Sequence, residues 1–175
     1  MVTEIQIRPC SPGDEHALAL VGQATFLETF AGLLAGPDIV AHCATAHAVG
    51  WYRDGLADPD ARLWLVETAQ GRAPVGLMVV APARLPLPDL SGQDLEIKRI
   101  YLLGKFQGGG TGKKLVAAAV EHARRRNASR LLLGVYAGNA AAIGFYERVG
   151  FGKLGSRQFD VGGRSYDDNI MGMPL

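Results

Sequence analysis

A glycine-rich segment near the middle of the chain has the composition of a phosphate-binding loop. It reads Gln107-Gly108-Gly109-Gly110-Thr111-Gly112-Lys113 and lies between a strand-like run and an amphipathic stretch. A turn from a strand into a helix leaves backbone N–H groups unpaired at the positive end of the helix dipole, and glycines let a phosphate approach the main chain. We therefore expect the segment to hold a pyrophosphate. A flexible connection that binds nothing is the alternative.

Two common nucleotide motifs can be tested against this segment because each fixes its own spacing. A P-loop needs glycine where Gln107 stands, and serine or threonine where Lys114 follows Lys113. A dinucleotide fingerprint that begins at Gly108 needs glycine or alanine at the position of Lys113. Both motifs fail, which leaves the pattern Gln-x-x-Gly-x-Gly.

Asn139 and Tyr146 lie on the helix expected over 139–150. They are seven residues apart, and on a regular helix this separation points both side chains the same way, about 10 Å apart. The alternatives are an asparagine that only caps a helix and a buried tyrosine whose hydroxyl is satisfied by the protein.

A cluster of histidine and cysteine residues could suggest a metal site. His42 and His47 diverge by about 140° on a helix, and no carboxylate completes a set with Cys43. We therefore expect core or surface residues here and no metal ion.

The residues named so far must be positioned by alternating strands and helices. Apolar periodicity and turn residues predict strands at 3–8, 62–68, 74–80, 95–103, 130–136, 151–161 and 165–173, and helices at 14–27, 38–56, 113–127 and 139–150. The strands at 62–68 and 74–80 should form a hairpin. The order in the second half predicts an α/β (α+β) fold, with a mixed sheet covered by helices.

Composition limits the class of protein. The chain has 175 residues, 48% of them hydrophobic, which predicts a single domain over residues 1–175 with a sizeable core. A net charge of +1 without a basic stripe does not indicate nucleic acid or a membrane as partner. Two cysteines and no visible signal peptide or spanning segment favour a reduced, cytoplasmic location.

The segment 94–152 resembles the GCN5-related N-acetyltransferase (GNAT) superfamily. Gln107, Gly110 and Gly112 fill its Gln-x-x-Gly-x-Gly element, and residues 139–151 are similar to its Asn-x-x-Ala-x-x-x-Tyr-x-x-x-Gly-Phe element. The resemblance implies a GNAT fold: a central, mixed, mostly antiparallel sheet, splayed in its middle and flanked by helices on both faces. It also implies acetyl-CoA as cosubstrate, without a metal.

Further stretches resemble the bacterial spermidine/spermine acetyltransferases of this superfamily. They are 26–30, 95–101, 133–136 and 167–171. Gly104 departs from the superfamily, which often has proline there, and Asp168-Asn169 is a looser match to the ending of that branch. The resemblance implies a polyamine acceptor, whose charges the carboxylates of Glu28, Glu96, Asp160, Asp167 and Asp168 could bind.

The resemblance also implies roles for individual residues. Those implied to bind the cofactor are Ile100, Tyr101, Leu102, Gln107, Gly108, Gly109, Gly110, Thr111, Gly112, Lys113 and Asn139. Among them, the main chain of residues 100–102 would pair with the pantetheine arm, although these could also be core strand residues. Tyr146 would protonate the departing CoA thiolate as a general acid.

A base is also needed, because an alkylammonium has a pKa of about 10.4 in water. Glu96 stands where histone acetyltransferases of the superfamily hold a catalytic glutamate. Strand alternation puts Lys98 on the same face, so an ion pair competes with the base role. A chain of water molecules is the other route for the proton.

The function expected from the sequence is transfer of acetyl from acetyl-CoA to a primary amine, by direct attack in a ternary complex. Cys10 and Cys43 lie outside both motifs, so an acetyl-cysteine intermediate has no support. The partner would be a small-molecule amine such as spermidine or spermine. A protein N-terminus, an amino acid, an antibiotic amine and a CoA-binding sensor without transfer are the alternatives, and assembly as a homodimer is left open.

Overall fold

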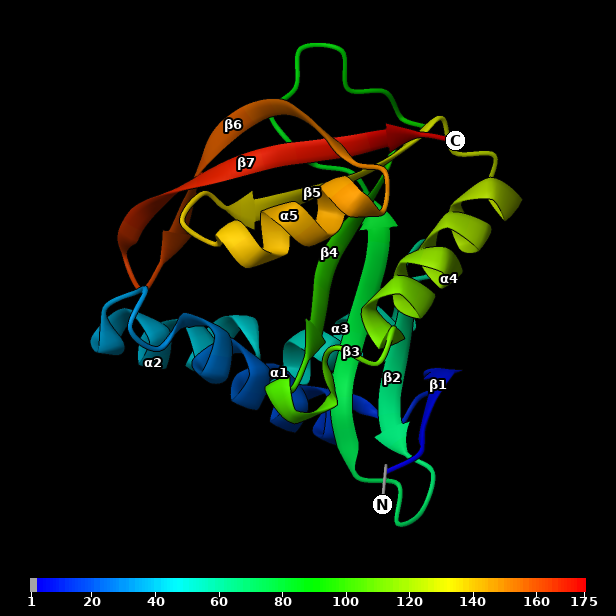
Figure 1. Cartoon of the computed structure of the whole chain (residues 1–175), viewed down its shortest axis with the longest axis vertical. Helices are drawn as coiled ribbons and strands as arrows, with labels where there is room; N and C mark the ends of the chain where they lie inside the picture. Colours follow the sequence, from blue (N-terminus) through cyan, green and yellow to red (C-terminus); the bar gives the residue numbers. More distant parts are fainter. Residues whose placement is uncertain (1–2) are drawn as a thin grey trace.

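The computed structural model describes residues 3–175 and contains one seven-stranded sheet with helices on both faces (Figure 1). The strands lie in the order β1-β2-β3-β4-β5-β7-β6. The elements are β1 (Ile5–Pro9), α1 (Glu15–Phe30), α2 (Gly36–Ala46), α3 (Val49–Ala57), β2 (Arg62–Thr68), β3 (Pro74–Pro82), β4 (Leu95–Leu102), the 3₁₀ turn η1 (Gly104–Phe106), α4 (Thr111–Arg125), β5 (Arg130–Tyr136), α5 (Ala140–Arg148), β6 (Gly152–Val161) and β7 (Arg164–Pro174).

The sheet opens in its middle, between β4 and β5. All neighbouring strands pair antiparallel except these two, which are parallel. Their pairing covers only Leu95–Ile97 against Leu131–Leu133. Beyond these residues the strands separate, and β5, β7 and β6 lie across the direction of β1 to β4 (Figure 1). The expected mixed, mostly antiparallel and splayed sheet is confirmed.

Alternation along β2 and β3 divides the interior into two layers. Trp64, Val66 and Met78 pack in the cluster that holds the apolar face of α4. Leu65 and Leu77 point the other way and pack with residues of α1 and α3. A strand buried on both faces must be apolar at nearly every position, and this explains the continuous hydrophobic runs of β2 and β3. Helices on both faces of the sheet are therefore confirmed.

The single helix expected over 38–56 is wrong, because the structure has α2 and α3 there. The two helices are separated at His47 and Ala48. His47 leaves helical geometry and is buried, and its Nδ1 lies 2.8 Å from the hydroxyl of Tyr52. No glycine or proline stands at the break, so local sequence carries no signal for it.

A bulge in β4 decides which side chains face each layer. The register opposite β3 shifts between Arg99 and Ile97, which leaves Lys98 as the extra residue. As a result Ile97 and Ile100 both pack in the α4 layer, while Tyr101 contacts the α1 and α2 side. Within residues 3–175, none of the helices combines the length and apolarity needed to cross a membrane.

Candidate active site

The glycine loop joins the end of β4 to the first turn of α4. Gly108 and Gly110 have φ values of 83° and 82°, in the left-handed region that favours glycine. A Cβ built on Gly108, Gly109 or Gly110 would meet no atom within 4 Å, so open space lies in front of the loop. No side chain among the described residues caps the N-terminus of α4. The first N–H groups of this helix are thus available to an anion.

The side chains of Gln107 and Glu28 fix the segment that leads into the glycine loop by hydrogen bonds to the main chain. The amide of Gln107 donates to the carbonyl oxygen of Leu102 at 2.7 Å, and the carboxylate of Glu28 accepts from Gly104 N at 2.7 Å. Gln107 therefore braces the loop through its side chain. Gly112 has a different use, because a Cβ there would lie 3.1 Å from Cζ of Phe145. That glycine lets α4 and α5 approach closely.

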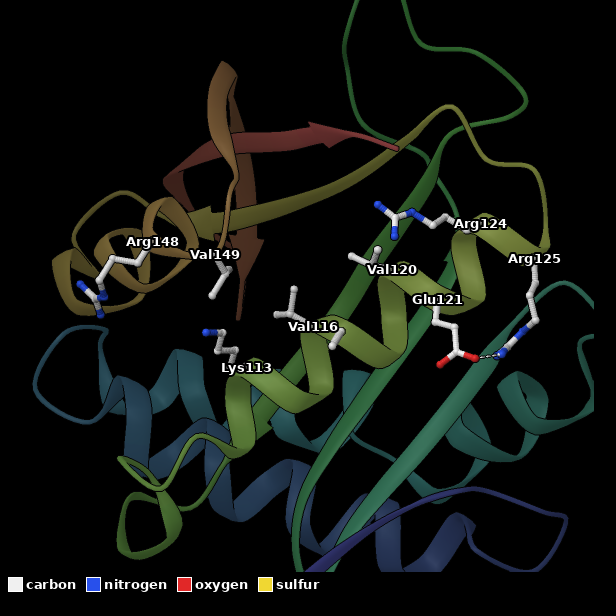
Figure 2. A pocket seen from close by; sticks show the side chains of 9 residues that line it. Lys113, Val116, Val120, Glu121, Arg124, Arg125, Arg148 and Val149 are labelled. Carbon is white, nitrogen blue, oxygen red and sulfur yellow. Dashed lines mark hydrogen bonds and ion pairs between the residues drawn. The ribbon is translucent and has the colours of Figure 1, made fainter.

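A basic groove leads away from the loop between α4 and α5 (Figure 2). This α4–α5 groove has a volume of about 660 Å³ and is lined by Lys113, Val116, Ala117, Val120, Glu121, Arg124, Arg125, Arg148 and Val149. Figure 2 shows Lys113 and Arg124 extending toward the gap between the helices, whereas Arg125 turns aside to pair with Glu121. Arg124 and Arg148 were not expected from the sequence. Their only signal was a basic residue at the end of each predicted helix.

A second cavity, here called the splay cavity, lies where β4 and β5 separate. Its volume is about 110 Å³. It is lined by Phe26, Phe30, Leu34, Ile97, Lys98, Arg99, Ile100, Tyr101, Leu133, Gly134, Val135, Tyr136, Tyr146, Arg157, Phe159, Val161, Tyr166 and Asp168. The structure thus brings Ile100, Tyr101 and Tyr146 together. It does not place Leu102, Glu96 or Asn139 in this lining.

Tyr146 reaches the splay cavity from α5. Its ring is mostly buried and lies edge-on to Phe145 and Phe151, at centroid distances of 5.3 and 5.8 Å. Burial raises the pKa of the Tyr146 hydroxyl above its ordinary value, with a smaller contribution from Tyr101. The hydroxyl therefore keeps its proton at neutral pH, as a proton donor must.

Asn139 lies at the N-terminus of α5, the helix that carries Tyr146. Its Oδ1 accepts a hydrogen bond of 3.2 Å from Ala142 N, so the side chain caps α5. The capping alternative therefore describes the geometry of this residue.

Glu96 lies in the strand that feeds the glycine loop but turns away from the splay cavity. It is 4% exposed, and its Oε2 accepts from Arg84 N at 3.0 Å and pairs with the Lys98 ammonium. The ion pair that strand alternation predicted has formed. Because both partners bind one carboxylate oxygen inside the fold, this geometry does not favour Glu96 as the base.

The remaining acidic residues expected around a polyamine are also engaged. Glu28 binds Gly104 N, Asp160 accepts from Ser165, and Asp167 accepts from Gln158. Asp168 lines the splay cavity, and its Oδ2 lies 3.1 Å from both Nε and Nη2 of Arg157. A cluster of unpaired carboxylates is therefore absent from the lining of this cavity.

His42, Cys43 and His47 pack around Phe26 in the interior of the fold. His42 stacks on Phe26 at a centroid distance of 4.5 Å, and burial lowers the pKa of His47 to about 2. Within residues 3–175, no group of three or more His, Cys, Asp or Glu residues could hold a metal ion.

Comparison with known proteins decides the family. Residues 30–151 match the model of the acetyltransferase (GNAT) family. The chain belongs to the GNAT family. A mycothiol acetyltransferase of Saccharomonospora viridis is 36% identical over 104 residues, which cover 57% of this chain and 32% of that protein. The chain spans between 20% and 51% of the length of the first curated relatives that it matches.

Solved structures share the GNAT fold over nearly the whole chain. The PaiA N-acetyltransferase of Thermoplasma acidophilum, solved in complex with coenzyme A, has a TM-score of 0.81 at 18% identity and covers 98% of this chain and 99% of its own. A ribosomal-protein-alanine N-acetyltransferase of Brucella melitensis has a TM-score of 0.70 at 26% identity, covering 97% and 99%. The GNAT fold expected from the sequence is confirmed.

Proposed function

We propose that this protein transfers an acetyl group from acetyl-CoA to a small primary amine, by direct attack in a ternary complex. The observation that carries the proposal is the alignment of an open glycine loop, a splayed pair of strands and the buried Tyr146 hydroxyl. Each of these features meets a different part of acetyl-CoA.

The diphosphate of acetyl-CoA would bind at the glycine loop. The N–H groups at residues 108–113 lie at the N-terminus of the 15-residue helix α4, where the helix dipole favours negative charge. The nucleotide end would follow the α4–α5 groove, whose Lys113, Arg124 and Arg148 supply positive charge over an apolar floor.

The pantetheine arm would occupy the gap between β4 and β5. One edge of β4 pairs with β3 as far as Leu102, but its other edge pairs with β5 only through Ile97. The main-chain groups of Ile100 and Tyr101 on the open edge can therefore bind the amides of the arm, as an added strand would. The thioester would then lie at the splay cavity.

The chemistry then needs one proton to leave the acceptor and one to reach sulfur. The amine nitrogen attacks the thioester carbon, the tetrahedral intermediate collapses with cleavage of the C–S bond, and Tyr146 donates its proton to the thiolate. The cations Lys98 and Arg99 in the lining favour the neutral form of a nearby amine. With Glu96 turned away, we propose that water accepts the proton of the ammonium.

A covalent enzyme intermediate is not part of this proposal. Burial raises the pKa of the Cys10 thiol to about 12 and raises that of Cys43 as well, which disfavours the nucleophilic thiolate. Neither cysteine lines the splay cavity. Direct transfer between the two bound substrates requires neither of them.

Spermidine or spermine is the narrower acceptor that the sequence suggests. A chain of positive charges needs several carboxylates, since each screened pair contributes about 1 kcal/mol or less. The lining of the splay cavity supplies only Asp168, which is already paired. We therefore propose a small primary amine as the acceptor class, with a polyamine as one member to be tested.

The deciding experiment measures CoA thiol release from acetyl-CoA with a panel of polyamines, amino acids, aminoglycosides and a peptide N-terminus. Acetylation of at least one amine, together with acetyl-CoA binding in calorimetry, supports the proposal. Binding without any transfer would favour a CoA sensor. Absence of acetyl-CoA binding by the folded protein would overturn the proposal altogether.

A further inference from the structure

The charges that line the splay cavity do not cancel. Lys98, Arg99 and Arg157 supply three cations, and Asp168 is the one acidic residue in the lining. Lys98 pairs with Glu96 behind the cavity, and Arg157 pairs with Asp168. Within residues 3–175, Arg99 forms no ion pair with a carboxylate. Among the three cations of the lining, Arg99 is therefore the one without a carboxylate partner.

Arg99 is held in a fixed position by neutral groups. Its half-buried guanidinium lies over the ring of Trp51, 3.5 Å from the centroid, and 5.1 Å from that of Tyr52. Nη1 lies 3.4 Å from Nδ1 of His47. Since burial keeps His47 neutral, its ring supplies no negative charge to this contact. Stacking on an aromatic face leaves the edge of the guanidinium plane free to donate hydrogen bonds.

Arg157, the other arginine in the lining of the cavity, differs from Arg99 because it has a carboxylate partner. Its guanidinium crosses β5 at Gly134, where a Cβ would lie 2.5 Å from Nη2. A glycine in a nearly all-apolar strand thus makes room for this cation, and Asp168 neutralises it. The fold has therefore supplied a carboxylate to one cavity arginine and none to the other.

The lining between these charges is aromatic. It includes Phe26, Phe30, Tyr101, Tyr136, Phe159 and Tyr166. A partly desolvated guanidinium beside such a wall is costly to leave without a counter-ion, and a carboxylate satisfies its planar donors with two parallel hydrogen bonds. We propose that the acceptor is an amine that also carries a carboxylate, bound by Arg99, and an apolar or aromatic body that packs against this wall.

The inference rests on the proposed acetyl transfer and narrows its acceptor. A carboxylate carries one negative charge at neutral pH, which matches the single positive charge of Arg99. A phosphomonoester carries about −1.5 to −2 and would leave an excess. A polyamine would add cations beside an unpaired guanidinium. An amino acid with an apolar side chain has the three required features.

The test compares acceptors that differ only in the carboxylate. L-Phenylalanine is paired with phenethylamine and L-leucine with isoamylamine, and spermidine is included. The carboxylate form should have a kcat/KM about 10- to 100-fold higher in each pair, the range expected for a charge-assisted hydrogen bond. L-Phenylalaninamide controls for amine basicity, because its amine is the least basic of the three phenyl compounds and yet it should react poorly.

Variants assign the preference to Arg99. Arg99→Gln should lower kcat/KM for phenylalanine at least about tenfold more than that for phenethylamine, because both acceptors lose the cation near the amine but only phenylalanine loses a carboxylate contact. Arg99→Lys keeps the positive charge but lacks the planar guanidinium. Its kcat/KM for phenylalanine should therefore lie between those of the parent and of Arg99→Gln. Arg53→Gln, in α3 with a 61% exposed side chain, is the matched control and should match the parent. Calorimetry with acetyl-CoA verifies that each variant is folded.

The outcomes distinguish a failure of the carboxylate inference from a failure of the proposed acetyl transfer. Equal kcat/KM values within the pairs, or a preference that survives Arg99→Gln, overturn the carboxylate inference alone. The same holds if spermidine is acetylated and neither amino acid is. If no amine is acetylated by protein that binds acetyl-CoA, both the inference and the proposed transfer are overturned.

Discussion

Tyr146 is the residue whose position carries most of the proposed chemistry. Tyr146→Phe removes the hydroxyl and leaves the ring packed against Phe145 and Phe151. We expect turnover to fall about 10²-fold or more, because the thiolate then leaves without a proton donor. The dissociation constant of acetyl-CoA should stay within a few-fold. Thiol release and calorimetry measure the two quantities, and undiminished turnover would reduce Tyr146 to a packing residue.

Glu96 is expected to act through structure, because Arg84 N and the Lys98 ammonium occupy its carboxylate. Glu96→Gln should leave the shape of the pH–rate profile unchanged and lower the free energy of unfolding by about 1–3 kcal/mol, as one hydrogen-bonded charge is lost. Steady-state rates across pH and denaturant unfolding check these expectations. A rate loss confined to low pH, where amine deprotonation is rarest, would instead make Glu96 the base.

The glycine loop would bind the phosphates through its backbone N–H groups rather than through any one side chain. Gly110→Asp places a carboxylate in the open space before the loop and should abolish acetyl-CoA binding in calorimetry. Gly71→Asp is a matched control: Gly71 has φ of 80°, also faces open space, and lies in the β2–β3 turn. Both variants bear the same backbone strain, so a loss shared by both would refute the phosphate site.

The bulge at Lys98 shows how a single extra residue in β4 affects both of the proposed ligand sites. It leaves Ile97 and Ile100 on the α4 side, where we propose that the cofactor binds, and turns Arg99 and Tyr101 toward α1 and α3. A regular strand would alternate without this change of phase. The proposed acceptor wall and the proposed pantetheine edge thus share one strand.

Acetyl-CoA should stabilise the whole molecule, because its proposed site draws on both halves of the splayed sheet. At a concentration 100-fold above the dissociation constant, a ligand that binds only the folded state adds about 2.7 kcal/mol. For a chain of this length the melting temperature should rise by roughly 5–10 °C. Differential scanning calorimetry measures the shift. Gly110→Asp should show no rise, and Gly71→Asp should show the rise of the parent.

Acid should weaken the fold through the buried His47. Its pKa is lowered to about 2 by burial, so the unfolded chain binds a proton there that the folded chain does not. Between pH 6.5 and the folded pKa, this group alone should reduce the free energy of unfolding by about 1.4 kcal/mol for each pH unit of acidification. His42 and His122, whose pKa values are also lowered by burial, add to the same slope.

Urea titrations from pH 7 to pH 4 measure this dependence. His47→Asn should flatten the slope, whereas His16→Asn, at an exposed position on α1, should leave it unchanged. An identical slope in the parent and in His47→Asn would show that His47 is not the group that acid titrates.

Local sequence determined the strands, most of the helices and the proposed cofactor end of the site. Alternation and helical periodicity predicted all seven strands, and the pattern Gln-x-x-Gly-x-Gly located the glycine loop before α4. These features depend on residues close together in the chain, whose backbone geometry is set by their own side chains and by missing Cβ atoms. Tyr146 was likewise singled out by a local motif, the resemblance of residues 139–151 to the family's Asn-x-x-Ala-x-x-x-Tyr element.

Only the tertiary structure revealed the proposed acceptor end of the site. Arg99, Arg157 and Asp168 come from β4, β6 and β7, and strand order alone brings them to one cavity. The separation of α2 from α3 at His47 and the inward turn of Glu96 also depend on partners far along the chain. Charge balance is a property of side chains gathered in space. A sequence with a net charge of +1 can therefore enclose a cavity with one unpaired arginine, and its composition gives no sign of it.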